Sequence, residues 1–177
     1  MQKLRQPTSI SCFGCGKDNP LGLKMEWFNN YEQKQVEAEF ELSDNYCSYP
    51  GTVHGGIVAT ILDETSGRAI MLNNDFARLM VTLKMEVVYK QNTPTNTKLK
   101  AIGRVLRDGG SRAQVEGEIL LPDGTVCASC KSILVKIPQA VPARFGTEAD
   151  EWNRTTPQVP QGCNCGPEGH VCGEKSK

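Results

Sequence analysis

Residues 50–72 read PGTVHGGIVATILDETSGRAIML, and this stretch carries a regular pattern of apolar residues. Largely apolar side chains recur along it at intervals of three and four residues, the spacing that places side chains on one face of a helix. They are Val58, Ile61, Leu62, Thr65, Ala69 and Leu72. Gly55 and Gly56 precede the pattern and are typical of a tight turn. We therefore predict one long helix from Gly55 to Leu72.

A second face of the predicted helix carries small side chains and one carboxylate. At about 100° per residue, its members fall within roughly 60° of one another. They are Gly56, Thr60, Asp63 and Gly67. Small residues let an extended ligand come close, and Asp63 is the ionisable group on this face. Glu64 points roughly 80° away, so the two carboxylates cannot address the same spot, and we favour Asp63.

The start of this helix suits attack on a carbonyl group. Backbone N–H groups there lack partners within the helix, glycines let a ligand approach them, and the helix dipole favours negative charge. A carboxylate two turns further along can activate water. The sequence leaves simpler interpretations open: Asp63 as a solvated surface charge, His54 as a helix cap, and the glycines as a turn alone.

Strand patterns flank the helix on both sides. Alternation of apolar and polar residues predicts half-buried strands at 36–42 and 81–89. Glycine-containing turns at 108–111 and 122–124 separate three further strands, at 98–107, 112–121 and 125–137. A short strand at 23–28 brings the total to about six. Tight turns between consecutive strands imply an antiparallel sheet with one helix on its apolar face, an α+β fold.

Length and composition place this sheet in one domain. With 177 residues, the chain can build one good core. We predict a cysteine-containing segment at 1–20, the α+β domain at 21–137, and an irregular, proline-containing extension at 138–177. One helix is too small to cover six curved strands, so we expect a second copy of the chain to complete the burial.

Charge and hydropathy exclude several classes of partner. Twenty basic and twenty acidic side chains cancel, which argues against nucleic-acid and membrane binding. No stretch is apolar enough for a signal peptide or a membrane span, so we expect a cytoplasmic protein. The eight cysteines are then mostly thiols.

A possible zinc site lies in the tail. Four soft ligands fall within ten residues there: Cys163, Cys165, His170 and Cys172. They could bind zinc alone or together with Cys12 and Cys15, whose alternative interpretation is a turn built of small residues. We expect no metal in the catalytic site itself and no obligatory cofactor.

The order of these elements resembles the hotdog-fold acyl-CoA thioesterases of the phenylacetate-pathway type. The resemblance rests on residues 50–56 leading into a long helix, with Asp63 nine residues after His54, and covers roughly residues 12–137. The segment CFGCGKDNPLGL at 12–23 is also similar to the start of many superfamily members. This resemblance implies a sheet wrapped around the central helix, with two copies forming a continuous sheet and active sites at their boundary.

The resemblance also implies roles for individual residues. Asp63 would act as general base or nucleophile, and the Gly56 amide would polarise the thioester carbonyl. His54 would anchor the loop or touch the thioester, and the Thr82 hydroxyl would assist. Further substrate contacts would come from Gly55, Glu64, Ser48, Arg107, Gly109, Gly110 and Arg112. Of these, Ser48 stands where some relatives carry an amide side chain. Arg107, Gly109, Gly110 and Arg112 would bind the phosphates of coenzyme A. The alternative is that these four residues form only a solvated hairpin tip.

The function expected from these residues is hydrolysis of a small or medium acyl-CoA thioester. The alternative is a non-catalytic acyl-CoA-binding or sensing module that uses the same cleft. A hydratase is disfavoured, because Arg68 stands where one group of such enzymes has the histidine of its Asp-His pair, about five residues after the aspartate. The sequence leaves open the acyl chain, the choice between dimer and tetramer, and Glu64 as a replacement base.

Overall fold

The helix forms where the apolar spacing predicts it. In the computed structural model, which describes residues 3–76 and 78–137, helix α1 spans Gly55–Arg68. The predicted end at Leu72 is wrong by four residues, because the chain continues as the 3-10 turn η2, Ala69–Met71. The apolar face of α1 is buried, with Ile61 1% and Leu62 0% exposed. No helix of the described segments is long and apolar enough to cross a membrane.

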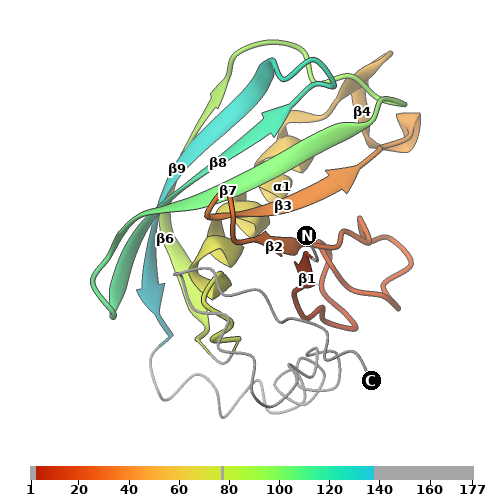
Figure 1. The fold of residues 1–177 in the computed structure, drawn as a ribbon. Coiled ribbons are helices and arrows are strands. Elements are labelled where there is room, and N and C mark those ends of the chain that lie inside the picture. The colour runs from red at the N-terminus through yellow and green to blue at the C-terminus, as the bar shows by residue number, and fades with distance from the viewer. Residues whose placement is uncertain (1–2, 77, 138–177) are drawn as a thin grey trace, which may run out of the picture.

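A seven-stranded antiparallel sheet curves around α1 (Figure 1). In spatial order its strands are β1 (Leu4–Arg5), β2 (Phe28–Asn30), β3 (Gln35–Phe40), β7 (Leu99–Asp108), β8 (Arg112–Leu120), β9 (Val126–Lys136) and β6 (Met80–Tyr89). A separate pair, β4 (Cys47–Tyr49) and β5 (Thr52–Val53), follows the 3-10 turn η1 (Asp44–Tyr46) and leads into the helix. The prediction of an α+β hotdog architecture is confirmed.

The predicted strand at 23–28 is wrong in extent. Only Phe28 belongs to β2, and Lys24 adopts a left-handed φ of 57°. The amide of Leu23 donates to the carbonyl of Phe13 at 2.8 Å, and that of Met25 donates to Gly14 at 3.0 Å. Residues 23–25 therefore pair with the cysteine-containing N-terminal segment. Strand β1 of that segment also pairs with β2 and so forms the edge of the sheet.

Two glycines let the helix lie close against the sheet. Gly103 on β7 and Gly117 on β8 are cross-strand partners beneath α1. A Cβ atom on Gly103 would lie 2.4 Å from the Thr65 carbonyl oxygen, and one on Gly117 would lie 3.3 Å from that of Leu62. The helix backbone thus approaches the sheet more closely than any side chain here would allow.

Strand β6 forms an exposed apolar edge of the sheet. It pairs with β9 on one side and with no strand of the described chain on the other. Met85 and Val87 pack against the core as predicted, but Val81, Leu83 and Tyr89 are 45%, 60% and 54% exposed. The prediction that alternation places all five side chains on one buried face is therefore wrong for a single chain, because the register of β6 shifts between Thr82 and Lys84.

Candidate active site

His54 caps the start of α1. Its Nδ1 accepts a hydrogen bond from the Gly56 amide at 2.9 Å, and its carbonyl oxygen accepts from Ile57 and Val58. On the neighbouring strand, the Tyr89 hydroxyl donates to the Gly55 carbonyl at 2.9 Å, which ties the first turn of α1 to β6. A ligand carbonyl that bonds to the Gly56 amide therefore has to replace the imidazole nitrogen.

Asp63 is held by a hydroxyl of the edge strand. Thr82 Oγ1 donates to Asp63 Oδ1 at 2.7 Å, and the carboxylate is half-buried. On the same helix face, Thr60 is half-buried and Gly56 is exposed. A Cβ atom built on Gly67 would meet no atom of residues 3–76 and 78–137 within 4 Å. The small-residue face of α1 therefore borders open space beside β6, as its composition predicts.

A β-bulge in β6 makes the contact with Thr82 possible. The pairing with β9 shifts between Thr82, opposite Leu134, and Lys84, opposite Ile133. The additional residue, Leu83, changes the phase of the strand. Thr82 consequently faces α1 together with Met85, although strict alternation would place these two side chains on opposite faces.

Glu64 lies apart from Asp63. Its Oε2 accepts from Arg68 Nε at 3.3 Å, and its Oε1 lies 3.8 Å from Cys12 Sγ. The side chain thus faces the N-terminal segment, whereas Asp63 faces β6. The structure brings Gly56, Asp63 and Thr82 to one side of α1 and places Glu64 on another.

The β7–β8 hairpin is exposed and internally braced. Arg78 donates to both carboxylate oxygens of Asp108 at 2.5 and 2.6 Å, and also to the Gly110 carbonyl. The Arg78 hydrogen bonds lower the pKa of Asp108 to about 2. Arg107 and Arg112, both exposed, make no ion pair within the described segments. Nothing in the sequence pattern around position 78 indicated this brace.

The remaining predicted positions fall elsewhere. Ser48 is exposed on β4, and Gly109 closes the hairpin by donating to the Arg112 carbonyl at 2.9 Å. Cys12 and Cys15 lie close to Glu64. Cys163, Cys165, His170 and Cys172 lie outside the described residues, so zinc binding by the tail stays a prediction.

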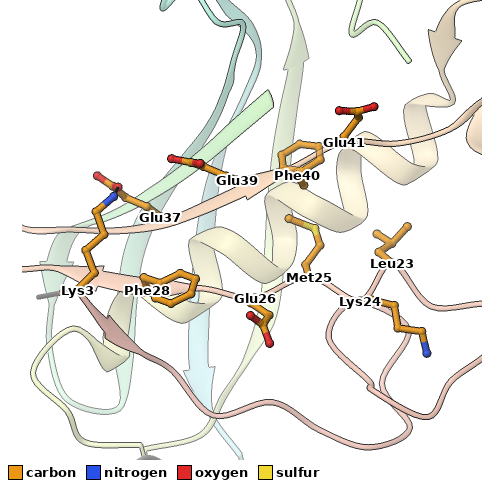
Figure 2. A pocket seen from close by; sticks show the side chains of 10 residues that line it. All are labelled: Lys3, Leu23, Lys24, Met25, Glu26, Phe28, Glu37, Glu39, Phe40 and Glu41. Carbon is orange, nitrogen blue, oxygen red and sulfur yellow. Dashed lines mark hydrogen bonds and ion pairs between the residues drawn. The ribbon is translucent and has the colours of Figure 1, made fainter. Parts of the chain in front are cut away.

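Two surface grooves lie away from these groups. One, of about 600 Å³, runs between β3 and the segment at 23–28, where Figure 2 shows Glu37, Glu39 and Glu41 on one side and Lys24 and Glu26 on the other. The second, of about 620 Å³, lies along the ends of β3, β7 and β8. Neither includes Gly56, Asp63 or Thr82.

Comparison with known proteins finds one similar family. Residues 50–128, which carry α1 and strands β6, β7 and β8, match the model of the thioesterase superfamily. Over these residues the chain is similar to that superfamily. A solved structure described as a thioesterase superfamily protein superimposes with a TM-score of 0.65 at 25% identity, over 71% of this chain and 60% of that one. The hotdog fold expected from the sequence is thereby confirmed.

Two other proteins are also similar to this chain. Rat (Rattus norvegicus) acyl-coenzyme A thioesterase THEM4 is 27% identical over 93 residues, which are 52% of this chain and 39% of that protein. The chain therefore spans well under half the length of that relative. A protein of Streptococcus pneumoniae TIGR4 that is described as a hypothetical thioesterase, solved with coenzyme A, has a TM-score of 0.54 at 19% identity, over 59% of this chain and 80% of the other. The phenylacetate-pathway type stays a prediction.

Proposed function

We propose that this protein belongs to the thioesterase superfamily and hydrolyses an acyl-CoA thioester with Asp63 as the base. The observation that carries the proposal is the 2.7 Å hydrogen bond from Thr82 to Asp63, which holds a carboxylate on the open face of α1. A fixed carboxylate beside open space can take a proton from water, and such a base contributes about 10² to 10⁴ in rate.

The proposed reaction uses the start of the same helix. Water attacks the thioester carbonyl carbon while Asp63 takes its proton, and the carbonyl oxygen bonds to the Gly56 amide in place of His54 Nδ1. The tetrahedral intermediate then releases coenzyme A as the thiolate. The thiolate takes the proton from Asp63, and a carboxylic acid is left as the other product. One such amide donor is typically worth roughly 3 to 4 kcal/mol of transition-state stabilisation.

A second copy of the chain would complete the site. Gly56, Asp63 and Thr82 border the exposed apolar edge of β6, and neither groove of the single chain includes them. A copy that pairs along β6 would bring a second such face opposite the first and enclose the acyl group between them. We propose a dimer as the smallest active unit.

The coenzyme A moiety would bind at the β7–β8 hairpin. Arg107 and Arg112 carry exposed guanidinium groups, which suit phosphate, and the Arg78–Asp108 pair braces the loop that contains Gly109 and Gly110. Two similar proteins support this ligand, since one is named as an acyl-coenzyme A thioesterase and the other was solved with coenzyme A.

A non-catalytic acyl-CoA-binding module is the second candidate. The hydrogen bond between His54 Nδ1 and the Gly56 amide favours it, because this bond occupies the donor that the reaction needs. Such a module would bind acyl-CoA tightly and release no thiol.

The decisive experiment measures thiol release from short, medium and aromatic acyl-CoAs. Asp63→Asn keeps the shape of the side chain and removes the base, so we expect kcat to fall by about 10² to 10⁴ while acyl-CoA binding persists. Asp123→Asn, in the exposed β8–β9 turn, is the matched control and should retain activity. An unchanged rate in Asp63→Asn would contradict the proposed base, and binding without turnover in the native chain would favour the non-catalytic module.

A further inference from the structure

The N-terminal segment places two thiols and a carboxylate together against α1. Cys15 is 2% exposed, whereas Cys12 and Glu64 are half-buried. One ligand atom from each of the three residues lies within 4.8 Å of the other two. The proposed hydrolysis uses none of these atoms, because Asp63 and Thr82 face the other side of the helix.

Backbone amide groups donate hydrogen bonds to both sulfur atoms. The Gly14 amide donates to Cys12 Sγ at 3.3 Å, and the Ser9 amide donates to Cys15 Sγ at 3.3 Å. The turn closes through Gly16, whose amide donates to the Cys12 carbonyl at 2.8 Å. A Cβ atom on Gly16 would lie 2.3 Å from that carbonyl oxygen, so the turn requires glycine. Amide donors directed at sulfur favour the thiolate form that metals bind.

Glu64 is oriented toward this pair by Arg68. The guanidinium of Arg68 lies 4.4 Å above the Trp27 ring, donates to the Pro7 carbonyl at 3.0 Å, and reaches Glu64 Oε2 at 3.3 Å. This contact leaves Glu64 Oε1 directed at Cys12. Two thiolates and a carboxylate carry three negative charges, which a divalent cation and the Arg68 guanidinium would balance.

The spacing fits tetrahedral zinc. Zn–S bonds of about 2.3 Å and Zn–O bonds of about 2.1 Å place neighbouring tetrahedral ligand atoms roughly 3.6 Å apart. Glu64 Oε1 and Cys12 Sγ are 3.8 Å apart, so small shifts would admit the ion. The soft sulfur ligands select zinc over magnesium or calcium, which prefer oxygen.

We propose that Cys12, Cys15 and Glu64 bind one zinc ion, with water in the fourth position. The ion has a structural role: it fastens the N-terminal segment to the turn of α1 that also carries Asp63. This inference is independent of the proposed hydrolysis. Its test measures the zinc content of the protein and the absorption spectrum of the cobalt-substituted protein.

The test separates this site from the soft ligands of the tail. In the full-length chain, Cys163, Cys165 and Cys172 are replaced by serine, and this tail-serine protein serves as the parent for every variant. After purification with zinc and reductant, it should retain about one zinc per chain by elemental analysis. Cys12→Ser and Cys15→Ser should each reduce the zinc content to near zero, whereas Cys47→Ser, which removes an exposed thiol, should leave it unchanged. Circular dichroism confirms that each variant is folded.

Two further measurements probe the ligand set. Cobalt exchanged into the parent protein should show a thiolate-to-cobalt charge-transfer band and intense tetrahedral d–d bands, both lost in Cys12→Ser. Glu64→Gln should weaken zinc binding by more than about 100-fold, since loss of an outer partner already weakens such sites about 10- to 100-fold. The proposal is overturned by a folded parent that retains no zinc, by full zinc content in Cys12→Ser, or by a Cys12–Cys15 disulfide in the parent isolated with zinc and reductant.

Discussion

Among the residues that the structure describes, the Thr82 hydroxyl is the group that orients the Asp63 carboxylate. Thr82 reaches it only because the bulge at Leu83 changes the phase of β6. A bulge next to a functional side chain is a common way to redirect it without altering the rest of the strand.

We expect Thr82→Val to lower kcat by about 10- to 100-fold. A hydrogen bond to a charged group is worth about 1.5 to 3 kcal/mol, and its loss leaves the Asp63 carboxylate free to rotate away from the proposed water. Steady-state thiol release measures the effect. Thr82→Ser keeps the hydroxyl and is the matched control, so equal losses in both variants would argue that β6 packing, rather than the hydrogen bond, is responsible.

At the scale of elements, the approach of α1 to the sheet depends on cross-strand glycines. The Thr65 and Leu62 carbonyls of the helix lie over Gly103 and Gly117. Because the atoms nearest to a Cβ on Gly103 would be the Thr65 carbonyl oxygen and carbon, no change of rotamer can relieve a methyl group added there.

Gly103→Ala should therefore destabilise the fold by about 1 to 3 kcal/mol, the usual range for overpacking. Urea unfolding followed by circular dichroism measures it. Gly67→Ala is the control with the opposite sign: it adds a methyl group on α1 where no atom lies within 4 Å, and alanine is better than glycine in a helix by about 0.5 to 1 kcal/mol. Equal stability of Gly103→Ala and the native chain would show that the helix can shift freely.

Glu37 connects three neighbouring strands, β2, β3 and β7, in the part of the sheet away from β6. Its buried carboxylate on β3 accepts from Lys3 at 2.6 Å and from Asn30 on β2 at 2.7 Å, and Lys100 on β7 lies 3.1 Å away. Burial by itself would raise the pKa of Glu37, but hydrogen bonds from Lys3, Gln35, Asn30 and Lys100 outweigh it and lower that pKa to about 2.

Because this pKa is depressed, the stabilisation by Glu37 is full above the ordinary value near 4.5 and is lost as the pH falls toward 2. The contribution amounts to about 3 kcal/mol. We expect the free energy of unfolding to fall between pH 5 and 2.5, and to fall less steeply in Glu37→Gln. Parallel pH profiles of the two proteins would contradict this linkage. Glu41→Gln, at an exposed position, is the control.

For the whole molecule, the exposed edge at β6 is the place where we propose that two copies assemble. Strand β6 pairs with β9 along one edge, and its other edge pairs with no strand of the described chain. It carries Val81, Leu83, Val88 and Tyr89 at 45%, 60%, 49% and 54% exposure, so its free edge is a template for pairing with another strand. The proposed active site borders this edge, so assembly and activity should be lost together.

Leu83→Lys should shift the protein from dimer to monomer, because a charge on each copy would have to be buried at the interface. Light scattering coupled to size-exclusion chromatography measures the mass, and thiol release in the same fractions should fall with it. Leu21→Lys changes a leucine that is 74% exposed in the N-terminal segment, so it should leave the measured mass and the rate of thiol release unchanged. A monomer with full activity would contradict the proposal that two copies form the site.

The sequence by itself determined the helix, the five longer strands and their turns. These elements follow from local patterns: apolar residues at helical spacing around Leu62, alternation in the strands, and glycine at the hairpin turns. Each pattern records which side of one element is buried, and that information lies within a few residues of chain. The small-residue face with Asp63 was predictable for the same reason.

Only the tertiary structure decided the contacts between distant segments. The bulge that turns Thr82 toward Asp63, the cross-strand glycines beneath α1, the Arg78–Asp108 brace and the packing of Cys12 against Glu64 each join residues at least 14 positions apart. No local periodicity encodes such pairs, because they depend on strand register and on how closely the helix packs against the sheet.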